Sequence, residues 1–282
     1  MTDTGDAPRR APAERISLFV SDVDGTIVTH DKNLAASTVE AAHRLKEAGV
    51  ALAVVSSRPP RGMMKLPGPL GLELFGGFNG AAIVRPDLSP VEEHFVPFEA
   101  AREAADVMAR QGADVWVFAD NEWLILNPEG AYVPRERHTV DFDPTVVDAF
   151  GDRLGRAGKI VGSSRDFDML ARCEAELQAM LGGAASARRS QAYYLDITHP
   201  TADKGYAVKA FAAHFGVPLD EVAVIGDMAN DLPMFSVGGL SIAMGNASPE
   251  VKACADFSTR TNDEDGWAAA VEAYILPRAR RA

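Results

Sequence analysis

The sequence predicts an α/β protein in which a doubly wound parallel sheet forms a core and a smaller α+β module is inserted into that core. Three observations predict this architecture. Strand and helix patterns alternate near both ends of the chain, and their rhythm changes between residues 86 and 192. That middle stretch also holds 11 basic and 19 acidic residues, which is −8 of the total net charge of −12. Alternating strands and helices favour a parallel sheet, and the charge asymmetry favours a separate module.

The N-terminal part predicts a strand, a helix and a second strand in succession. Residues 16–20 form an apolar, β-rich run that is typical of a strand buried on both faces. A helical stripe of apolar and small side chains follows at residues 34–48, and Gly49 ends it. Residues 50–55 predict the second strand, and residues 75–84 predict a third strand region beyond a loop rich in Pro and Gly. Strand, helix and strand at this spacing make a βαβ unit.

The middle of the chain predicts strands and helices in a different order, and the βα rhythm returns after Pro200. Middle strands are expected at residues 91–96, 115–119, 123–126, 159–162 and 193–197, and middle helices at residues 101–108 and 170–181. Later elements are expected at residues 208–215, 222–225, 240–244 and 267–275. We therefore expect a core at residues 14–85 and 193–282, the inserted module at residues 86–192, and a disordered tail at residues 1–13.

Composition excludes several classes of protein. With 47% hydrophobic residues the chain can bury a sizeable core, which excludes wholesale disorder. An isoelectric point near 5.0 argues against a surface for nucleic acid or anionic membrane. The sequence shows no apolar run near the roughly 20 residues of a membrane helix and no secretory signal, and its two cysteines indicate a reducing compartment. We expect a cytoplasmic monomer or small homo-oligomer whose partner is a small molecule.

Polar side chains follow four of the predicted core strands. They are Asp22 and Asp24 after the first strand, Ser56, Ser57 and Arg58 after the second, Asn79 after the third, and Asp227, Asn230 and Asp231 after the strand at 222–225. Lys204 opens the helix just after the inserted module. Ligands bind at the carboxyl ends of the strands in an open parallel sheet, so we expect these side chains to gather at one rim.

Three of these side chains, those of Asp22, Asp24 and Asp227, predict a metal site. Oxygen ligands without His or Cys suit Mg²⁺ rather than Zn²⁺, and three carboxylates repel one another unless a cation lies among them. A lone Asp-Gly step usually marks only a turn. An EF-hand loop is excluded because it needs Gly at its sixth and Glu at its twelfth position. Counted from Asp22, Gly stands at the fourth position and Asn33 at the twelfth.

These residues resemble, in order, the four motifs of the haloacid dehalogenase superfamily of phosphatases. The motifs are Asp22-Val-Asp24-Gly25-Thr26, the strand end at Ser56, Lys204-Gly205, and Gly226-Asp227-Met-Ala-Asn230-Asp231. The stretches 79–81, 203–205, 243–247 and 261–266 resemble the Cof-like branch, type IIB. That branch has a Rossmann-like core and an α/β cap inserted between the second and third motifs. The resemblance covers residues 16–275.

The resemblance implies a role for each motif residue. Asp22 would be the nucleophile that attacks phosphorus and forms an aspartyl-phosphate. Asp24 would protonate the leaving oxygen and then deprotonate the water that hydrolyses the intermediate. Mg²⁺ would be held by the Asp22 carboxylate, the Asp24 carbonyl and Asp227. Ser56 and Lys204 would bind the transferring phosphoryl group.

Five further residues complete the candidate site. Asn79 and Asn230 are candidate contacts to substrate or phosphate. Asp231 is a candidate metal ligand, but we expect it to orient Lys204 or a metal-bound water rather than to bind the metal directly. Ser57 departs from the family pattern, which usually has Gly there, and its side chain would narrow the mouth of the site. Arg58 is either a substrate contact or one half of a salt bridge at the base of the loop.

The expected function is Mg²⁺-dependent hydrolysis of small phosphomonoesters, such as a sugar phosphate or a related metabolite, through an aspartyl-phosphate. Two alternatives stay open: a sugar phosphomutase of the same superfamily, and a non-catalytic module that binds phosphorylated metabolites. The sequence contains neither a P-loop motif nor a Gly-x-Ser-x-Gly elbow. The inserted module is expected to close over the phosphate and to set the choice of substrate.

Overall fold

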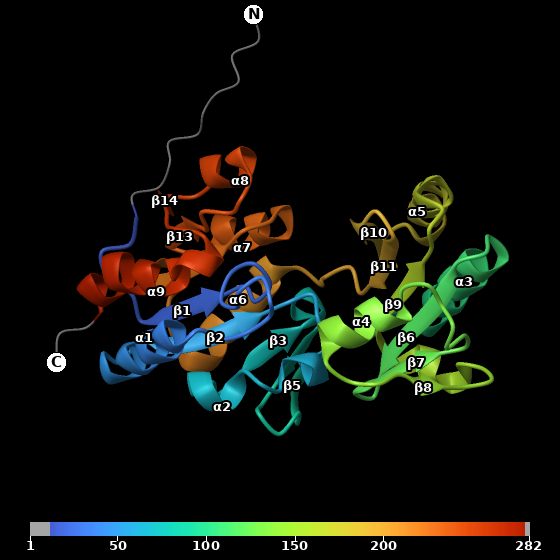
Figure 1. The fold of residues 1–282 in the computed structure, drawn as a ribbon, viewed down its shortest axis with the longest axis horizontal. Coiled ribbons are helices and arrows are strands. Elements are labelled where there is room, and N and C mark those ends of the chain that lie inside the picture. Colours follow the sequence, from blue (N-terminus) through green and yellow to red (C-terminus); the bar gives the residue numbers. More distant parts are fainter. Residues whose placement is uncertain (1–11, 280–282) are drawn as a thin grey trace, which may run out of the picture. The chain divides into compact units, whose positions relative to one another are not determined.

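The computed structural model describes residues 12–279 of the chain, and the chain forms two compact units (Figure 1). One unit comprises the described part of residues 1–53 and 208–282, and the other comprises residues 54–207. Most of the disordered tail expected at residues 1–13 lies outside the described residues. Within residues 12–279, the structure has no helix that is both long and apolar enough to cross a membrane.

The first unit is built from two separate pieces of sequence. Its elements in chain order are β1 (Leu18–Ser21), α1 (Ala36–Glu47), β12 (Val222–Gly226), α7 (Leu232–Val237), β13 (Leu240–Ala243), α8 (Pro249–Ala253), β14 (Phe257–Ser258) and α9 (Gly266–Ala270). A π-helical turn, Val271–Ile275, continues α9. Two elements, β2 (Ala51–Val55) and α6 (Lys204–Phe215), cross the boundaries at which the chain passes between the units.

The second unit is continuous in sequence. Its helices are α2 (Pro67–Leu70), α3 (Phe98–Arg110), α4 (Val133–Val140) and α5 (Phe167–Leu181). Its strands are β3 (Phe75–Gly77), β4 (Ala82–Val84), β5 (Pro90–Glu93), β6 (Asp114–Ala119), β7 (Glu122–Ile125), β8 (Thr145–Val146), β9 (Ala157–Ser163), β10 (Ser186–Gln191) and β11 (Tyr194–Thr198).

The larger sheet has eight strands in the order β14-β13-β12-β1-β2-β3-β4-β5. β12 pairs in parallel with β1 and with β13, and β13 pairs in parallel with β14. All four residues of β1 are buried, as a strand covered on both faces requires. The parallel pairing of strands that are separated by helices confirms the α/β fold class.

The far edge of this sheet is antiparallel. β4 pairs antiparallel with both β3 and β5, so the expected third strand region at residues 75–84 is a hairpin. The chain reverses at Asn79 and Gly80, whose φ angles of +56° and +100° suit Asn and Gly better than other residues. Because β5 belongs to this sheet, the sheet extends past residue 85, where the sequence placed the end of the core.

The smaller sheet has six strands in the order β10-β11-β9-β6-β7-β8. β11 pairs antiparallel with β9, so this sheet extends to Thr198 and past the boundary expected at residue 192. An apolar run shows that a strand is present, but the partner of that strand depends on the fold. Strands therefore pair across both positions, near residues 85 and 192, at which the sequence placed the limits of the inserted module.

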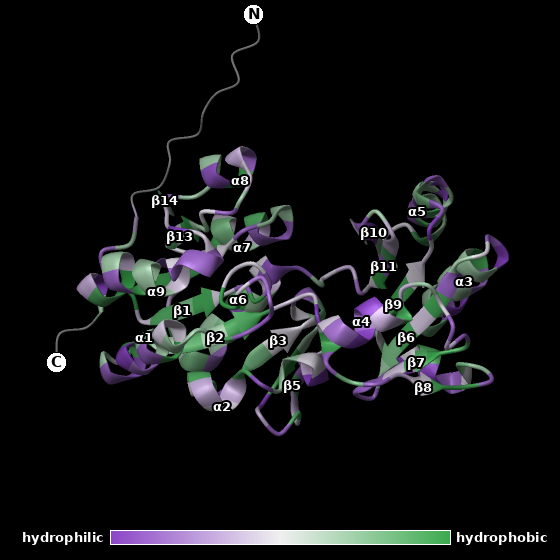
Figure 2. Ribbon diagram, viewed as in Figure 1, coloured by the Kyte–Doolittle hydropathy of each residue, from purple (hydrophilic) through white to green (hydrophobic). Residues whose placement is uncertain are grey.

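The two faces of the six-stranded sheet are covered differently. A large apolar cluster packs α3 and α5 on one face, with buried side chains such as Met108, Ile160 and Leu177. The other face carries Trp116 and Trp123 in a second cluster that includes the buried valines of α4. Figure 2 shows that α4 is mostly hydrophilic, whereas the strands β6, β7 and β9 are mostly hydrophobic.

A pair of stacked histidines predicts that acid destabilises the second unit. The ring centroids of His94 and His199 lie 5.1 Å apart, and burial, followed by the nearby His94, lowers the pKa of His199. The unfolded chain therefore binds a proton at this residue more readily than the folded chain does. The free energy of unfolding should fall as the pH drops through the ordinary histidine pKa of about 6.5.

Urea titrations at about pH 7 and about pH 5.5 would measure this fall. His199→Gln removes the titrating ring, so the difference in stability between the two pH values should shrink. The exposed histidine of α4 offers a matched control, and His138→Gln should leave the difference as it is. An unchanged pH difference in His199→Gln would show that the pair does not couple protonation to folding.

Candidate active site

The loop after β1 positions the first two candidate carboxylates. The Asp22 N–H donates to the Ile225 carbonyl of β12 over 3.0 Å, and Asp22 is only 5% exposed. The backbone N–H groups of residues 26–28 all donate to the Val23 carbonyl, which closes a tight turn directly after the strand. Asp22 therefore lies buried at the strand end, while Asp24 stands on the turn.

The loop after β12 is fixed by its own carboxylate. Asp231 is fully buried, and its Oδ2 accepts hydrogen bonds from the backbone N–H groups of Asp227 and Met228, both over 2.8 Å. Carboxylates that accept several backbone hydrogen bonds are strongly held in place. Asp231 thereby sets the path of the backbone that carries the Asp227 side chain.

Three carboxylates meet where these two loops approach each other. One oxygen each of Asp22, Asp227 and Asp231 lies within 4.8 Å of the other two. The Thr26 hydroxyl donates to Asp227 Oδ1 over 3.2 Å, and the Asn246 amide donates to Asp227 Oδ2 over 3.1 Å. The donor set contains only oxygen and carries concentrated negative charge, which fits a hard divalent cation such as Mg²⁺.

The Asp24 side chain lies outside this cluster. Its Oδ1 pairs with the Lys32 ammonium over 2.6 Å, and both side chains are about one-third exposed or less. The Asp24 carboxylate therefore does not join the other three carboxylates. This is compatible with the sequence expectation that Asp24 offers its backbone carbonyl, and not its carboxylate, to the metal. The Asp24 carboxyl group thus stands on the turn and is partly exposed.

Sequence reasoning missed two residues of this region. Asn246 belongs to the stretch 243–247 that carries the family resemblance, so a signal for it was present, although no role could be assigned. The Asn246 amide also donates to the Gly25 carbonyl over 2.9 Å and so ties the two loops together. Lys32 gave no signal, because its pairing with Asp24 depends on a turn in which Lys32 itself has a φ of +63°.

Gly25→Ala should damage metal binding beyond its effect on folding. Gly25 has a φ of +80°, and a Cβ there would lie 2.4 Å from Asp227 Oδ2. Backbone strain at such a position costs roughly 1–3 kcal/mol of stability. The Asp227 carboxylate would also be displaced, so the Mg²⁺ concentration needed for half-maximal activity should rise by about tenfold or more.

Gly49→Ala is the matched control for this prediction. Gly49 has a similar φ of +73°, but a Cβ there would meet nothing within 4 Å. Both variants should lose a similar amount of stability in urea titrations, whereas only Gly25→Ala should change the Mg²⁺ titration. If the two variants need the same Mg²⁺ concentration for half-maximal activity, the close approach of Gly25 to Asp227 does not influence metal binding.

The second unit carries the candidate residues that follow β2 and β3. Ser56 is buried, its hydroxyl accepts a hydrogen bond from the Arg58 N–H over 3.1 Å, and its carbonyl accepts one from the Asn79 N–H over 2.8 Å. The strand end and the hairpin turn are therefore joined through Ser56. The Arg58 guanidinium donates to the Gly62 carbonyl over 3.3 Å, which holds the base of the loop.

Two candidate residues lie in helical segments. Lys204 is the first residue of α6 and is only 1% exposed. Asn230 lies in the short 3₁₀ turn 229–231 of the first unit. Within the first unit the structure thus brings together Asp22, Asp227 and Asp231, and within the second it joins Ser56, Arg58 and Asn79.

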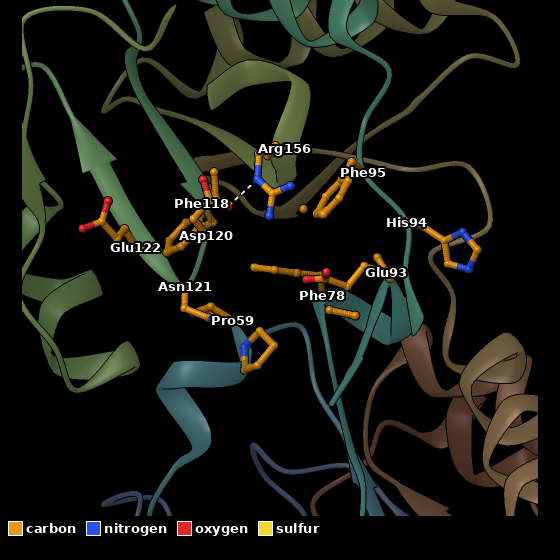
Figure 3. Close-up of a pocket in the computed structure, with 15 residues that line it drawn as sticks. Pro59, Phe78, Glu93, His94, Phe95, Phe118, Asp120, Asn121, Glu122 and Arg156 are labelled. Carbon is orange, nitrogen blue, oxygen red and sulfur yellow. Dashed lines mark hydrogen bonds and ion pairs between the residues drawn. The ribbon is translucent and has the colours of Figure 1, made fainter. Parts of the chain in front are cut away.

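A pocket in the second unit is lined by none of the candidate catalytic, substrate-binding or metal-binding residues that the sequence predicts. Phe78, Phe118 and Pro59 are among the residues that line it, and Arg156 forms an ion pair with Asp120 at its edge (Figure 3). The Arg156 guanidinium also lies over the Phe95 ring, 5.3 Å from its centroid. The positive charge of Arg156 is therefore already engaged by Asp120 and Phe95.

Comparison with known proteins identifies the family of this chain. A family model described as haloacid dehalogenase-like hydrolase matches residues 19–271. A Haemophilus influenzae protein that is provisionally named a phosphatase is 30% identical to this chain over 257 residues. The similar region covers 89% of this chain and 95% of the relative. A Bacillus subtilis protein named 5-amino-6-(5-phospho-D-ribitylamino)uracil phosphatase is 26% identical and covers 88% of this chain and 94% of its own length.

A solved structure shares the fold over nearly the whole chain. It is a haloacid dehalogenase-like hydrolase from Bacteroides thetaiotaomicron, with a TM-score of 0.85, 28% identity, and coverage of 92% of this chain and 99% of that structure. The match includes both carboxylate-bearing loops, after β1 and after β12, because the family model spans them. The chain is an enzyme that belongs to the haloacid dehalogenase-like hydrolases, as its four motifs predicted.

Proposed function

We propose that this enzyme is a Mg²⁺-dependent phosphatase that hydrolyses small phosphomonoesters through an aspartyl-phosphate on Asp22. The observation that carries the proposal is the cluster of Asp22, Asp227 and Asp231 at the ends of two parallel strands, in which Asp22 and Asp231 are buried and Asp227 is half-buried. A buried carboxylate that faces two others needs positive charge nearby, and a phosphate group adds more negative charge. The phosphatase names of the relatives support the same reaction class.

Asp22, Asp24 and one water molecule are sufficient for the bonds that form and break and for the two proton transfers of the reaction. An Asp22 carboxylate oxygen attacks phosphorus, the bond from phosphorus to the leaving oxygen breaks, and Asp24 gives that oxygen a proton. Water then attacks the same phosphorus, and Asp24 accepts the proton that the water loses. The bond from phosphorus to Asp22 breaks, and inorganic phosphate leaves, with Asp22 again a carboxylate and Asp24 again protonated for the next turnover.

The metal would be held by the carboxylates of Asp22 and Asp227 and by the Asp24 carbonyl, with Asp231 fixing the Asp227 backbone. When bound, Mg²⁺ supplies electrostatic stabilisation for the negative charge on the transferring phosphoryl group. The fit rests on the all-oxygen donor set and its close spacing. Thr26 and Asn246, which donate to Asp227, would keep its carboxylate aimed at the ion.

The remaining motif residues would bind the phosphate and the rest of the substrate. In this proposal Ser56 and Asn230 donate hydrogen bonds to phosphate oxygens, and Lys204 neutralises charge as the phosphoryl group transfers. The backbone N–H of Ser57 would face the phosphate, and Arg58 would hold the loop that presents it. The module around residues 86–192 would close over the site, exclude water and select the substrate.

Sugar phosphates and polyol phosphates are the substrate class that we propose. The relative from B. subtilis is named for a phosphorylated ribityl compound, and its similarity extends over most of both chains. A small hydroxyl-rich phosphate also suits an acidic enzyme, because one phosphate requires only a local pocket of positive charge.

Release of inorganic phosphate from a metabolite panel tests the proposal. Activity should appear with Mg²⁺, disappear with EDTA and return when Mg²⁺ is added in excess. A panel without any turnover, at Mg²⁺ concentrations that stabilise the protein against heat, would refute a phosphatase function. Phosphate release that survives EDTA and extensive dialysis would refute the metal requirement instead.

A further inference from the structure

The loop at residues 261–266, between β14 and α9 of the first unit, has no role in the proposed reaction (Figure 1). Its first turn is closed by Thr261 and Glu264, which form a capping box. The loop after β13 packs against its start, since the Gly245 N–H donates to the Arg260 carbonyl over 2.9 Å. A Cβ on Gly245 would lie 2.5 Å from the Arg260 carbonyl carbon. The two loops therefore meet backbone to backbone, which leaves neither of them much freedom.

The backbone of Asn262 orients the amide of Asn246. The Asn262 N–H donates to Asn246 Oδ1 over 3.2 Å. On its other side the Asn246 amide donates to Asp227 Oδ2 and to the Gly25 carbonyl. Asn246 is exposed, so without a fixed partner its amide would be free to turn its oxygen toward the Asp227 carboxylate. Because a backbone N–H can only donate, the bond from Asn262 keeps the NH₂ group of Asn246 on the side of Asp227.

The side chain of Asn262 holds the turn that carries Asp24. Its amide donates to the Val28 carbonyl over 3.0 Å. Val28 is the partner of Asp24 in an isolated β-bridge, and the Val28 N–H donates to the Val23 carbonyl over 3.2 Å. The Asp24 carbonyl is the backbone ligand that we have proposed for the metal. Asn262 thus braces, through Val28, the backbone that presents this carbonyl.

The same loop holds the segment that follows the turn at two further points. The His30 N–H donates to Asp263 Oδ1 over 2.8 Å, and the Ser37 hydroxyl donates to Asp265 Oδ1 over 2.5 Å. These two contacts fix the segment beyond the turn rather than the residues proposed as metal ligands. Asn262 differs from Asp263 and Asp265 because its contacts lead to both ligand-bearing loops of the metal site.

We propose that Asn262 is a positioning residue that sets the affinity of the site for Mg²⁺. Its backbone acts through Asn246 on the Asp227 carboxylate, and its side chain acts through Val28 on the Asp24 carbonyl. Groups that orient metal ligands typically contribute roughly tenfold to a hundredfold to metal affinity. This inference rests on the proposed function and adds to it a residue that is neither a metal ligand nor a catalytic group.

Calorimetric titration of the substrate-free enzyme with Mg²⁺ measures this affinity without turnover. Asn262→Ala removes the amide that holds Val28 and loosens the loop that holds Asn246, so the dissociation constant for Mg²⁺ should rise by roughly tenfold. Because no reacting group is lost, kcat at saturating Mg²⁺ should stay within about threefold of the wild-type value. Loss of folded protein alone would lower kcat and leave the dissociation constant as it is.

Asn127→Ala is the matched control for Asn262→Ala. Asn127, in the second unit, likewise donates its side-chain amide to a fixed acceptor, Asp114 Oδ1, over 3.0 Å. Asn127→Ala should lower stability in urea titrations without changing Mg²⁺ binding.

Asn262→Ser tests the proposal even if Asn262→Ala does not fold, because serine is well suited to turns. The serine hydroxyl lies one atom closer to the backbone than the amide nitrogen and so falls short of the Val28 carbonyl. Asn262→Ser should therefore weaken Mg²⁺ binding as Asn262→Ala does.

A double variant tests the route through Asn246. Once Asn246→Ala has removed the donor to Asp227, adding Asn262→Ala should raise the dissociation constant by no more than about threefold. A further rise of roughly tenfold in that background would show that the two residues act independently, and it would overturn the inference.

Two outcomes separate this inference from the proposed function. Asn262→Ala enzyme that loses stability but binds Mg²⁺ within about twofold of the wild-type affinity would overturn the role of Asn262 and leave the phosphatase function standing. Wild-type enzyme that neither binds Mg²⁺ in the calorimeter nor releases phosphate from any substrate would refute the proposed function itself.

Discussion

Asp22→Asn is expected to lower kcat by on the order of 10⁵-fold or more, because removal of a covalent nucleophile eliminates the chemical route itself. An amide is a poor nucleophile and cannot form the aspartyl-phosphate. The substitution is close to isosteric, and it removes one of three clustered negative charges, so the folded state should not lose stability. Initial rates of phosphate release at saturating Mg²⁺, together with a melting temperature, would measure the two effects separately.

Asp31→Asn is the matched control, since Asp31 is exposed and lies on the segment that follows the same turn. It should keep wild-type turnover. Asp22→Asn enzyme that retains more than about one-tenth of wild-type kcat, after contaminating phosphatase is excluded by repurification, would remove Asp22 from the nucleophile role. Loss of activity together with loss of the folded state would instead show that Asp22 serves the fold.

The core strands could be predicted from the sequence because they are buried on both faces. β1 and β12 are short, almost wholly apolar runs next to turn residues, and their short length favours a strand over a buried helix. α4 was missed for the opposite reason. It carries charged residues through its middle and buries only Val133, Glu136 and Val140, so its sequence has too few apolar residues to show a helical stripe.

The pairing of the edge strands could not be predicted, because it depends on contacts between distant segments. The β5 segment Pro90–Glu93 is mostly exposed and has little apolar character, yet it pairs with β4 in the larger sheet. β10, Ser186–Gln191, is an exposed and polar edge strand that gave no pattern to recognise. Strand partners are set by contacts between distant segments, which local periodicity does not report.

Much of the candidate site could be located because its residues stand next to strand ends. Asp22 lies 205 residues before Asp227, yet parallel pairing of β1 with β12 brings its carboxylate to those of Asp227 and Asp231. The residues that orient them were harder to find. The hydrogen bond from Asn246 to Asp227 and the ion pair from Lys32 to Asp24 arise between loops, where no repeating pattern constrains the chain.

Asp24→Asn should make the rate depend more steeply on the leaving group. A poor leaving group such as an alkoxide needs a proton as its bond to phosphorus breaks, and general acid catalysis contributes roughly 10²–10⁴-fold in such cases. Alkyl phosphates should therefore lose most of that factor in the first step. An aryl phosphate such as 4-nitrophenyl phosphate leaves as a stable phenolate, so formation of the aspartyl-phosphate should be nearly unaffected.

The second step should nevertheless slow for every substrate, because the Asp24 carboxylate is also the base that activates water. Stopped-flow mixing of Asp24→Asn enzyme with 4-nitrophenyl phosphate should then show a burst of nitrophenolate, near one equivalent per enzyme, followed by slow turnover. Lys32→Met keeps the Asp24 carboxyl group while removing its partner, so it should retain the wild-type dependence on the leaving group. Equal losses of rate across a series of alkyl and aryl phosphates, without a burst, would assign the proton transfers to a group other than Asp24.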